Sequence, residues 1–86
     1  MTVTLEIYTP QKVFEPMKAD KIVLPVKEGN LTIINGRAPR SQVLIKGDIV
    51  LLDPQNQALQ SFEINGGLAE IALDVCKVAT EEIKTK

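Results

Sequence analysis

The sequence predicts an all-β fold, a small two-sheet β-sandwich of about eight to ten short strands. Leu, Ile and Val dominate the apolar residues, and most of these three are β-branched, which favours a pleated sheet over a helix. Proline and glycine also recur along the chain, so that uninterrupted stretches rarely exceed about ten residues. The chain of 86 residues is long enough for one compact core and too short for a second domain.

The first strand is the clearest in the sequence. Val3, Leu5 and Ile7 alternate with polar neighbours, which is the period of a strand with one buried face. A turn at Pro10 follows, and Pro16 interrupts the extended structure that resumes after it. The remaining extended segments are predicted at residues 13–14, 20–26, 31–34, 41–46, 48–52, 59–64, 68–73 and 75–80.

Three connections between these segments can be recognised from their residues. Gly47 joins two segments tightly, and residues 53–57 have the composition of a polar turn. Gly66 and Gly67 indicate positive φ, either in a hairpin turn or at a strand corner with a bulge. We therefore expect residues 1–80 to form the sandwich and residues 81–86 a short charged tail, too short for an independent helix.

The composition excludes most kinds of enzyme. The chain has no histidine and one cysteine, so it offers no imidazole base, no thiolate metal cluster and no internal disulfide. We expect no catalytic, cofactor-binding or metal-binding residues, and we expect Cys76 to be a core residue. With ten basic and eleven acidic side chains, no positive field favours nucleic acid. The residue types thus predict a protein that is not an enzyme and has no small-molecule substrate.

The chain shows no signal for secretion or for a membrane span. Its first residues read directly into a strand, without a basic leader or a long apolar run. The longest apolar runs are far shorter than the roughly 20 residues of a spanning helix. We expect a soluble protein in a reducing compartment such as the cytoplasm.

Two surface features predict a protein partner. Residues 22–24 and 49–52 are apolar on both faces of their strands, so either the fold covers both faces or a partner covers one of them. We favour the partner. Residues 29–40 expose Asn30, Arg37 and Arg40 around Gly36, which is the composition of a recognition loop as well as of an ordinary connection.

Three stretches resemble one known family. They are LEIYTP followed by VF within residues 5–14, EGNLTIINGRAP at residues 28–39, and NGGLAEI followed by CKVA within residues 65–79. In this order and spacing they resemble the N-terminal β-sandwich of the epsilon subunit of F-type ATP synthase, which is called delta in mitochondria. The resemblance covers nearly the whole chain.

The resemblance implies a non-catalytic subunit of the central stalk, which couples rotation of the gamma subunit to the membrane ring of c subunits. It would be a peripheral part of a membrane complex, on the cytoplasmic side of the bacterial inner membrane. Family positions near the c-ring correspond here to Glu28, Asn30 and Leu31. Family positions on the gamma side correspond to Arg37, Arg40 and Gln42.

Four residues depart from the family pattern. Thr32 replaces a glycine, Arg40 a leucine, and Leu73 the proline or glycine of the last turn. Arg37 replaces a histidine, which implies a permanent charge without a pH switch. The α-helical hairpin that follows the sandwich in the family is missing, so the resemblance implies a coupling domain without the rotor brake.

Two other functions are compatible with the sequence. One is a stand-alone β-sandwich interaction module that serves another assembly, which the replacements at Arg37 and Arg40 keep open. The other is a carrier domain, because residues 16–19, with Lys18, resemble the Ala-Met-Lys-Met motif of biotinyl domains. Lys18 lies near the start of the chain, whereas a carrier lysine lies in the middle of its domain.

Overall fold

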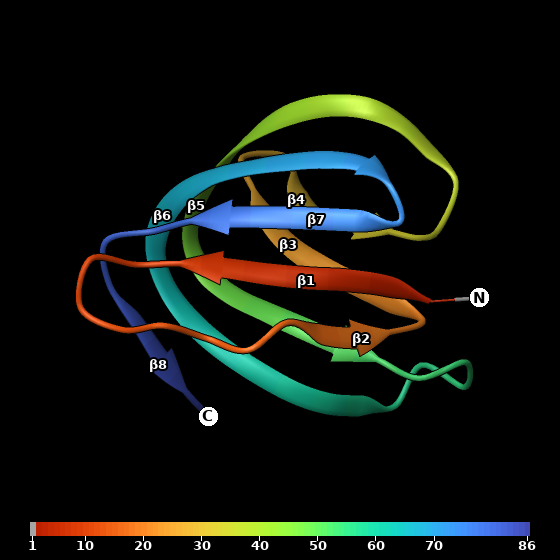
Figure 1. Ribbon diagram of the computed structural model, residues 1–86, viewed down its shortest axis with the longest axis horizontal. Coiled ribbons are helices and arrows are strands. Elements are labelled where there is room, and N and C mark those ends of the chain that lie inside the picture. Colours follow the sequence, from red (N-terminus) through yellow and green to blue (C-terminus); the bar gives the residue numbers. More distant parts are fainter. Residues whose placement is uncertain (1) are drawn as a thin grey trace.

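The computed structural model describes residues 2–86, except for the side chain of residue 37. The described residues form eight strands and no helix (Figure 1). The strands are β1 (Val3–Tyr8), β2 (Met17–Ala19), β3 (Lys21–Val26), β4 (Gly29–Ile33), β5 (Arg37–Leu52), β6 (Ala58–Leu73), β7 (Val75–Ala79) and β8 (Ile83–Thr85). The predicted all-β fold is therefore confirmed.

The strands form one sheet that curls on itself until its two halves face each other as the layers of a sandwich. Its order is β2-β1-β7-β6-β5-β3-β4, and β8 also pairs with β6. All neighbours are antiparallel except β1 and β7, which run parallel with Thr4 beside Val75. The long strands β5 and β6 curve from one layer into the other (Figure 1).

Two junctions that we expected between separate strands are bends within these long strands. Gly47 lies inside β5. Pro25 of β3 packs so closely against it that a Cβ atom on residue 47 would lie 2.7 Å from the Pro25 Cβ, which explains the glycine. Gly66 and Gly67 lie inside β6, which confirms a strand corner rather than a hairpin turn. A Cβ atom on Gly67 would lie 2.3 Å from the Ala79 carbonyl oxygen, so only glycine fits where β7 crosses the corner.

The core fills the space between the two layers. Val3, Leu5 and Ile7 of β1 are buried, as their alternation predicts. The Phe14 and Phe62 rings meet edge to face with their centroids 5.9 Å apart. The other buried apolar side chains are Ala19, Ile22, Leu24, Val26, Ile33, Leu44, Ile49, Leu51, Ile64, Ala69, Ile71, Cys76 and Val78.

The last six residues, expected as a charged tail, include β8. Ile83 pairs with Ile64 of β6, and Ile83 packs against the core. Lys86 Nζ lies 3.1 Å from Asp48 Oδ2 in an exposed ion pair. β8 thus adds a strand to the layer that contains the first half of β6. It pairs with the same edge of β6 that pairs with β7 farther along the strand.

Candidate partner-binding surfaces

The residues expected on the c-ring side lie at the turn between β3 and β4. Glu28 and Asn30 are exposed at this turn, and Asn30 pairs with Pro25. Leu31 is half-buried and packs against the core. Glu28 and Asn30 are therefore free to contact a partner, whereas Leu31 anchors the turn to the sandwich.

The residues expected on the gamma side lie at the start of β5. Exposed Arg40 donates through Nη2 to Gln42 Oε1 at 2.6 Å, and half-buried Gln42 donates through Nε2 to the Val43 carbonyl at 3.2 Å. The backbone of Arg37 pairs with Leu73, and its side chain lies outside the described residues. These contacts hold the Arg40 guanidinium along the strand.

The structure does not bring the two sets together. The segment that we expected to be a recognition loop is strand β4, a turn at Asn35 and Gly36, and the start of β5. The Asn35 side chain donates to the Thr2 carbonyl at 2.9 Å and fixes this turn. The first set lies at the β3–β4 turn and the start of β4, the second lies in β5 beyond the turn at Asn35 and Gly36, and no strand pairing among the described residues joins them. They form two separate candidate contacts.

A row of exposed apolar side chains crosses the outer face of one layer. The strand registers place Val43 of β5 beside Leu68 of β6, Leu68 beside Ala79 of β7, and Ala79 beside Tyr8 of β1. Val43 is 67% exposed, Tyr8 54% and Leu68 43%. Ile45 extends this surface along β5. We call these five residues the apolar row, and an open groove of about 750 Å³ runs along it.

A charged row lies directly beside the apolar row. Here Ser41 is beside Glu70, Glu70 beside Lys77, and Lys77 beside Glu6. The Tyr8 hydroxyl donates to Glu6 Oε1 at 2.7 Å, which raises the pKa of Tyr8. An apolar centre with a polar border is the usual construction of a protein interface.

The sequence pointed to a different apolar surface. Ile22, Leu24, Ile49 and Leu51 are buried in the core, and their outward neighbours at residues 23, 50 and 52 are only half-buried. The more exposed apolar side chains of the described residues lie elsewhere: Tyr8, Val43, Ile45 and Leu68 are on the apolar row, and Val13, Ile34, Leu59 and Leu73 lie outside it. The row cannot be recognised in the sequence, because its members come from four strands and only the registers show that they are neighbours.

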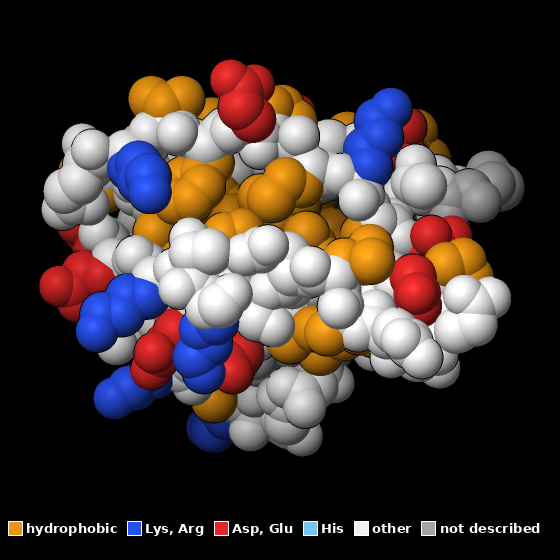
Figure 2. Space-filling model, turned by 90° about the horizontal axis from the view of Figure 1, so that it is seen from below, with side chains coloured by type: hydrophobic (Ala, Val, Ile, Leu, Met, Phe, Trp, Pro, Cys, Tyr) orange, Lys and Arg blue, Asp and Glu red, His pale blue; other side chains and the backbone are white. Residues whose placement is uncertain are grey.

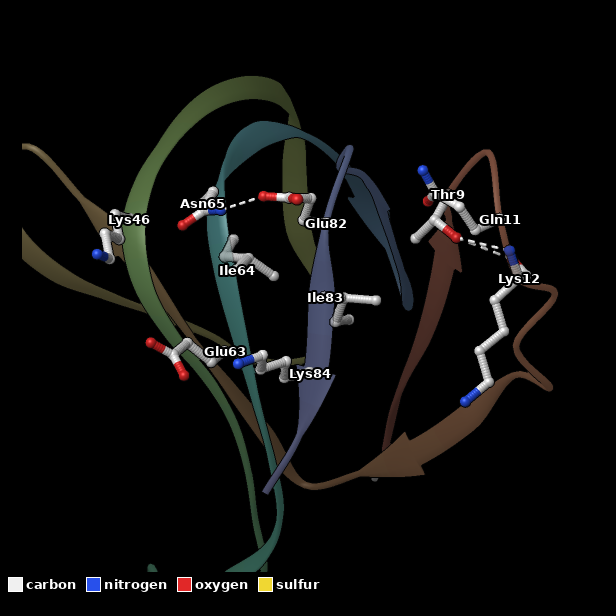
Figure 3. Close-up of a pocket in the computed structure, with 10 residues that line it drawn as sticks. All are labelled: Thr9, Gln11, Lys12, Lys46, Glu63, Ile64, Asn65, Glu82, Ile83 and Lys84. Atoms are coloured by element: carbon white, nitrogen blue, oxygen red, sulfur yellow. Dashed lines mark hydrogen bonds between the residues drawn. The ribbon is translucent and has the colours of Figure 1, made fainter.

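Apolar side chains also reach the surface on the side seen from below in Figure 1, between charged groups (Figure 2). An open groove of about 650 Å³ separates the segment after β1 from β8 (Figure 3). Thr9 Oγ1 and Lys12 bond to each other across a tight turn on one side, and Asn65 donates to Glu82 on the other. The groove mixes both signs of charge and holds no pair placed for acid and base catalysis.

Two side chains with nucleophilic atoms, Cys76 and Thr80, are buried. Burial raises the pKa of the Cys76 thiol to about 11, so the reactive thiolate is suppressed. The Thr80 hydroxyl donates to the Gly66 carbonyl at 2.7 Å. Among residues 2–86 no group of three or more His, Cys, Asp or Glu side chains is placed to hold a metal ion. The described part of the chain also contains no helix long and apolar enough to cross a membrane.

The comparison with known families identifies this fold. The model for the delta/epsilon chain of ATP synthase, β-sandwich domain, matches residues 2–86. The chain belongs to this family. The resemblance seen in the three sequence stretches is therefore confirmed over nearly the whole length.

Curated relatives of two lengths share this domain. The ATP synthase epsilon chain of Granulibacter bethesdensis is 32% identical over 81 residues, which cover 94% of this chain and 59% of the relative. The chain thus spans a little over half the length of the first relatives it matches. The epsilon chain of Chlorobaculum tepidum is 31% identical over 80 residues, which cover 93% of this chain and 90% of the relative.

Solved structures share the fold at lower sequence identity. A chain of the Euglena gracilis mitochondrial ATP synthase, solved as OSCP, F1 and c-ring, superimposes with a TM-score of 0.83 at 17% identity. The match covers 98% of this chain and 53% of that one. A chain of the central stalk and c-ring of the Tetrahymena thermophila enzyme gives a TM-score of 0.75 at 19% identity. That match covers 98% of this chain and 66% of the other.

The position of Lys18 argues against a carrier domain. A carrier lysine stands at the tip of a hairpin, where a partner enzyme can reach it. Lys18 lies in the middle of β2 and pairs with Thr4 of β1.

Proposed function

We propose that this chain is a non-catalytic rotor subunit of an F-type ATP synthase, which couples rotation of the gamma subunit to the c-ring. The observation that carries the proposal is the match of its sandwich to curated epsilon chains; the match to one of them covers 90% of that relative. The subunit would act as a peripheral part of the complex at the cytoplasmic side of the bacterial inner membrane.

Two separate contacts suit this mechanical role. In the proposal, Glu28 and Asn30 at the β3–β4 turn contact the polar loops of the c-ring, with Leu31 holding the turn in place. Arg37, Arg40 and Gln42 at the start of β5 contact gamma. Since the two sets belong to different parts of the sheet, the sandwich would touch both partners at once and transmit torque between them.

Reconstitution of the purified complex tests the proposal. Gamma and c subunits should co-purify with the tagged chain, and ATP-driven proton pumping should require it while ATP hydrolysis by the catalytic subunits does not. Substituting Glu28→Lys together with Asn30→Lys should weaken attachment of the c-ring and leave gamma bound. A chain that binds neither gamma nor the c-ring at micromolar concentration would sink the proposal and favour the stand-alone interaction module.

A further inference from the structure

The first half of β5 forms an open edge of the sheet. On one side β5 pairs with β6 from Arg37 to Leu52. On the other side, within the described residues, β3 pairs with β5 at Val50, Leu51 and Leu52. Residues 38–47 therefore have a strand on one side only, and Figure 1 shows this segment arching along the rim.

The course of β3 explains why this edge is open. β3 leaves β5 after Val23 and continues along β4, where Pro25 pairs with Asn30. Proline has no N–H group to donate to a neighbouring strand. The Pro25 ring instead packs onto Gly47, so β3 covers β5 there through a side chain and not through a hydrogen-bonded ladder.

The two ends of this edge carry residues that discourage pairing with another strand, and the middle does not. Pro39 and Lys46 are residues that discourage edge-to-edge pairing. Residues 41–45 carry neither a charge nor a proline, and Val43 and Ile45 are exposed. An open strand edge with exposed apolar side chains aggregates unless a partner covers it.

The charges on the edge argue against a second copy as that partner. If two β5 edges paired antiparallel and centred on Val43, Arg40 of one copy would face Lys46 of the other. Parallel pairing in register would place each cation opposite itself. Like charges directly opposite each other destabilise a strand pair. The edge is complementary to a different chain with acidic residues at both ends of the pairing segment.

We propose that residues 41–46 of β5 accept an extended segment of a partner, which adds a strand to this layer. The segment presents an apolar side chain beside Val43, so that the apolar row continues into the partner, and acidic side chains near Arg40 and Lys46. The inference rests on the proposed function, because it takes the partner to be the gamma subunit. Main-chain hydrogen bonds hold the segment, and the alternating side chains select it.

Amide hydrogen exchange of the full chain, free and bound to purified gamma, tests this assignment. In the free chain the outward amides of residues 41–46 exchange quickly. In the complex every second amide of this segment should exchange at least about tenfold more slowly, because a new strand bonds to alternate residues.

Substitutions supply a second measurement. Val43→Lys should weaken gamma binding at least about tenfold, because it sets a charge in the apolar centre of the contact. Leu59→Lys changes another exposed apolar residue, in β6 and outside the row; it is the matched control and should leave binding unchanged. Arg40→Glu and Lys46→Glu should each weaken binding about two- to fivefold.

The outcomes separate this inference from the proposed function. A gamma complex in which residues 41–46 exchange as fast as in the free chain would overturn strand addition and leave the rotor role intact. Protection of the same amides by self-association of the free chain would overturn the choice of partner. Failure to bind gamma at all would defeat the proposed function and this inference together.

Discussion

Cys76 shows how one buried side chain makes stability depend on pH. It has no exposed surface and lies between the layers, beside Leu5 of β1 in the parallel register. Burial raises the pKa of its thiol from 9.0 to about 11, because the core cannot solvate a thiolate. The folded chain therefore keeps this proton over a range of pH in which the unfolded chain has released it.

The free energy of unfolding should consequently fall as pH rises from about 9 to about 11. Between these values the unfolded state binds fewer protons than the folded state, so the slope is negative, and the loss is about 2–3 kcal/mol. Urea titrations at several pH values measure it. The Cys76→Ala variant is the control, since it lacks the thiol. An identical slope in both proteins would contradict the prediction.

Leu73 is a residue whose backbone is strained. It ends β6 with φ of 50°, a left-handed conformation that a leucine adopts at a cost of about 1 kcal/mol. Its side chain is 65% exposed, so little packing offsets this cost. Leu73→Gly should therefore raise the free energy of unfolding by about 0.5–1 kcal/mol.

Urea denaturation of Leu73→Gly and Leu59→Gly separates strain from a general effect of glycine. Leu59 is 55% exposed in an extended part of β6, where glycine should lower the free energy of unfolding by about 0.5–1 kcal/mol. Opposite signs for the two variants are expected. Equal losses of stability would show that the conformation of Leu73 carries no strain.

At the scale of elements, one hydroxyl group holds both the corner of β6 and the segment that leads into β8. Thr80 follows β7 and is buried; its Oγ1 donates to the Gly66 carbonyl at 2.7 Å and lies 3.3 Å from the Glu82 carbonyl. It thereby connects the bend in β6 to the segment that leads into β8. The close approach of Ala79 to Gly67 fixes the other side of the same corner.

The Thr80→Val variant should lose about 1–2 kcal/mol of stability, because the Gly66 carbonyl loses its buried partner. Amides of β8 should also exchange faster, since the connection that leads into this strand is loosened. Thr80→Ser keeps the hydroxyl and should preserve most of both properties. Calorimetry and hydrogen exchange provide the two measurements. A valine variant as stable as the wild type would contradict this role.

At the scale of the whole molecule, the sequence predicts what depends on local pattern and misses what depends on register. The alternation of Val3, Leu5 and Ile7 identifies a buried face without knowledge of any neighbour. Positive φ at Gly66 fits both a turn and a corner, so the pattern alone left both open. Gly47 looked like a junction, whereas its small size serves a contact with Pro25 that is distant in sequence.

The candidate surfaces show the same difference between local sequence pattern and strand register. Family positions suggest Glu28, Asn30, Arg40 and Gln42 as candidates, and the structure adds that the first two lie at the β3–β4 turn and the other two in β5. The apolar row and the open edge of β5 arise from how four strands align and from where β3 departs. Such pairings join residues far apart in the chain, and hydrophobic periodicity contains no information about them.

The parallel pairing of β1 with β7 has a consequence for how the chain is made. β1 is synthesised before β7, yet the two strands are neighbours along Thr4–Tyr8, and Thr4 pairs with Val75 far along the chain. Closing so long a loop costs entropy before the contact rewards it, and folds rich in such contacts form slowly. Val3, Leu5 and Ile7 therefore lack this neighbouring strand until β7 has been synthesised, and until then the new chain depends on rapid closure or on chaperones to avoid association.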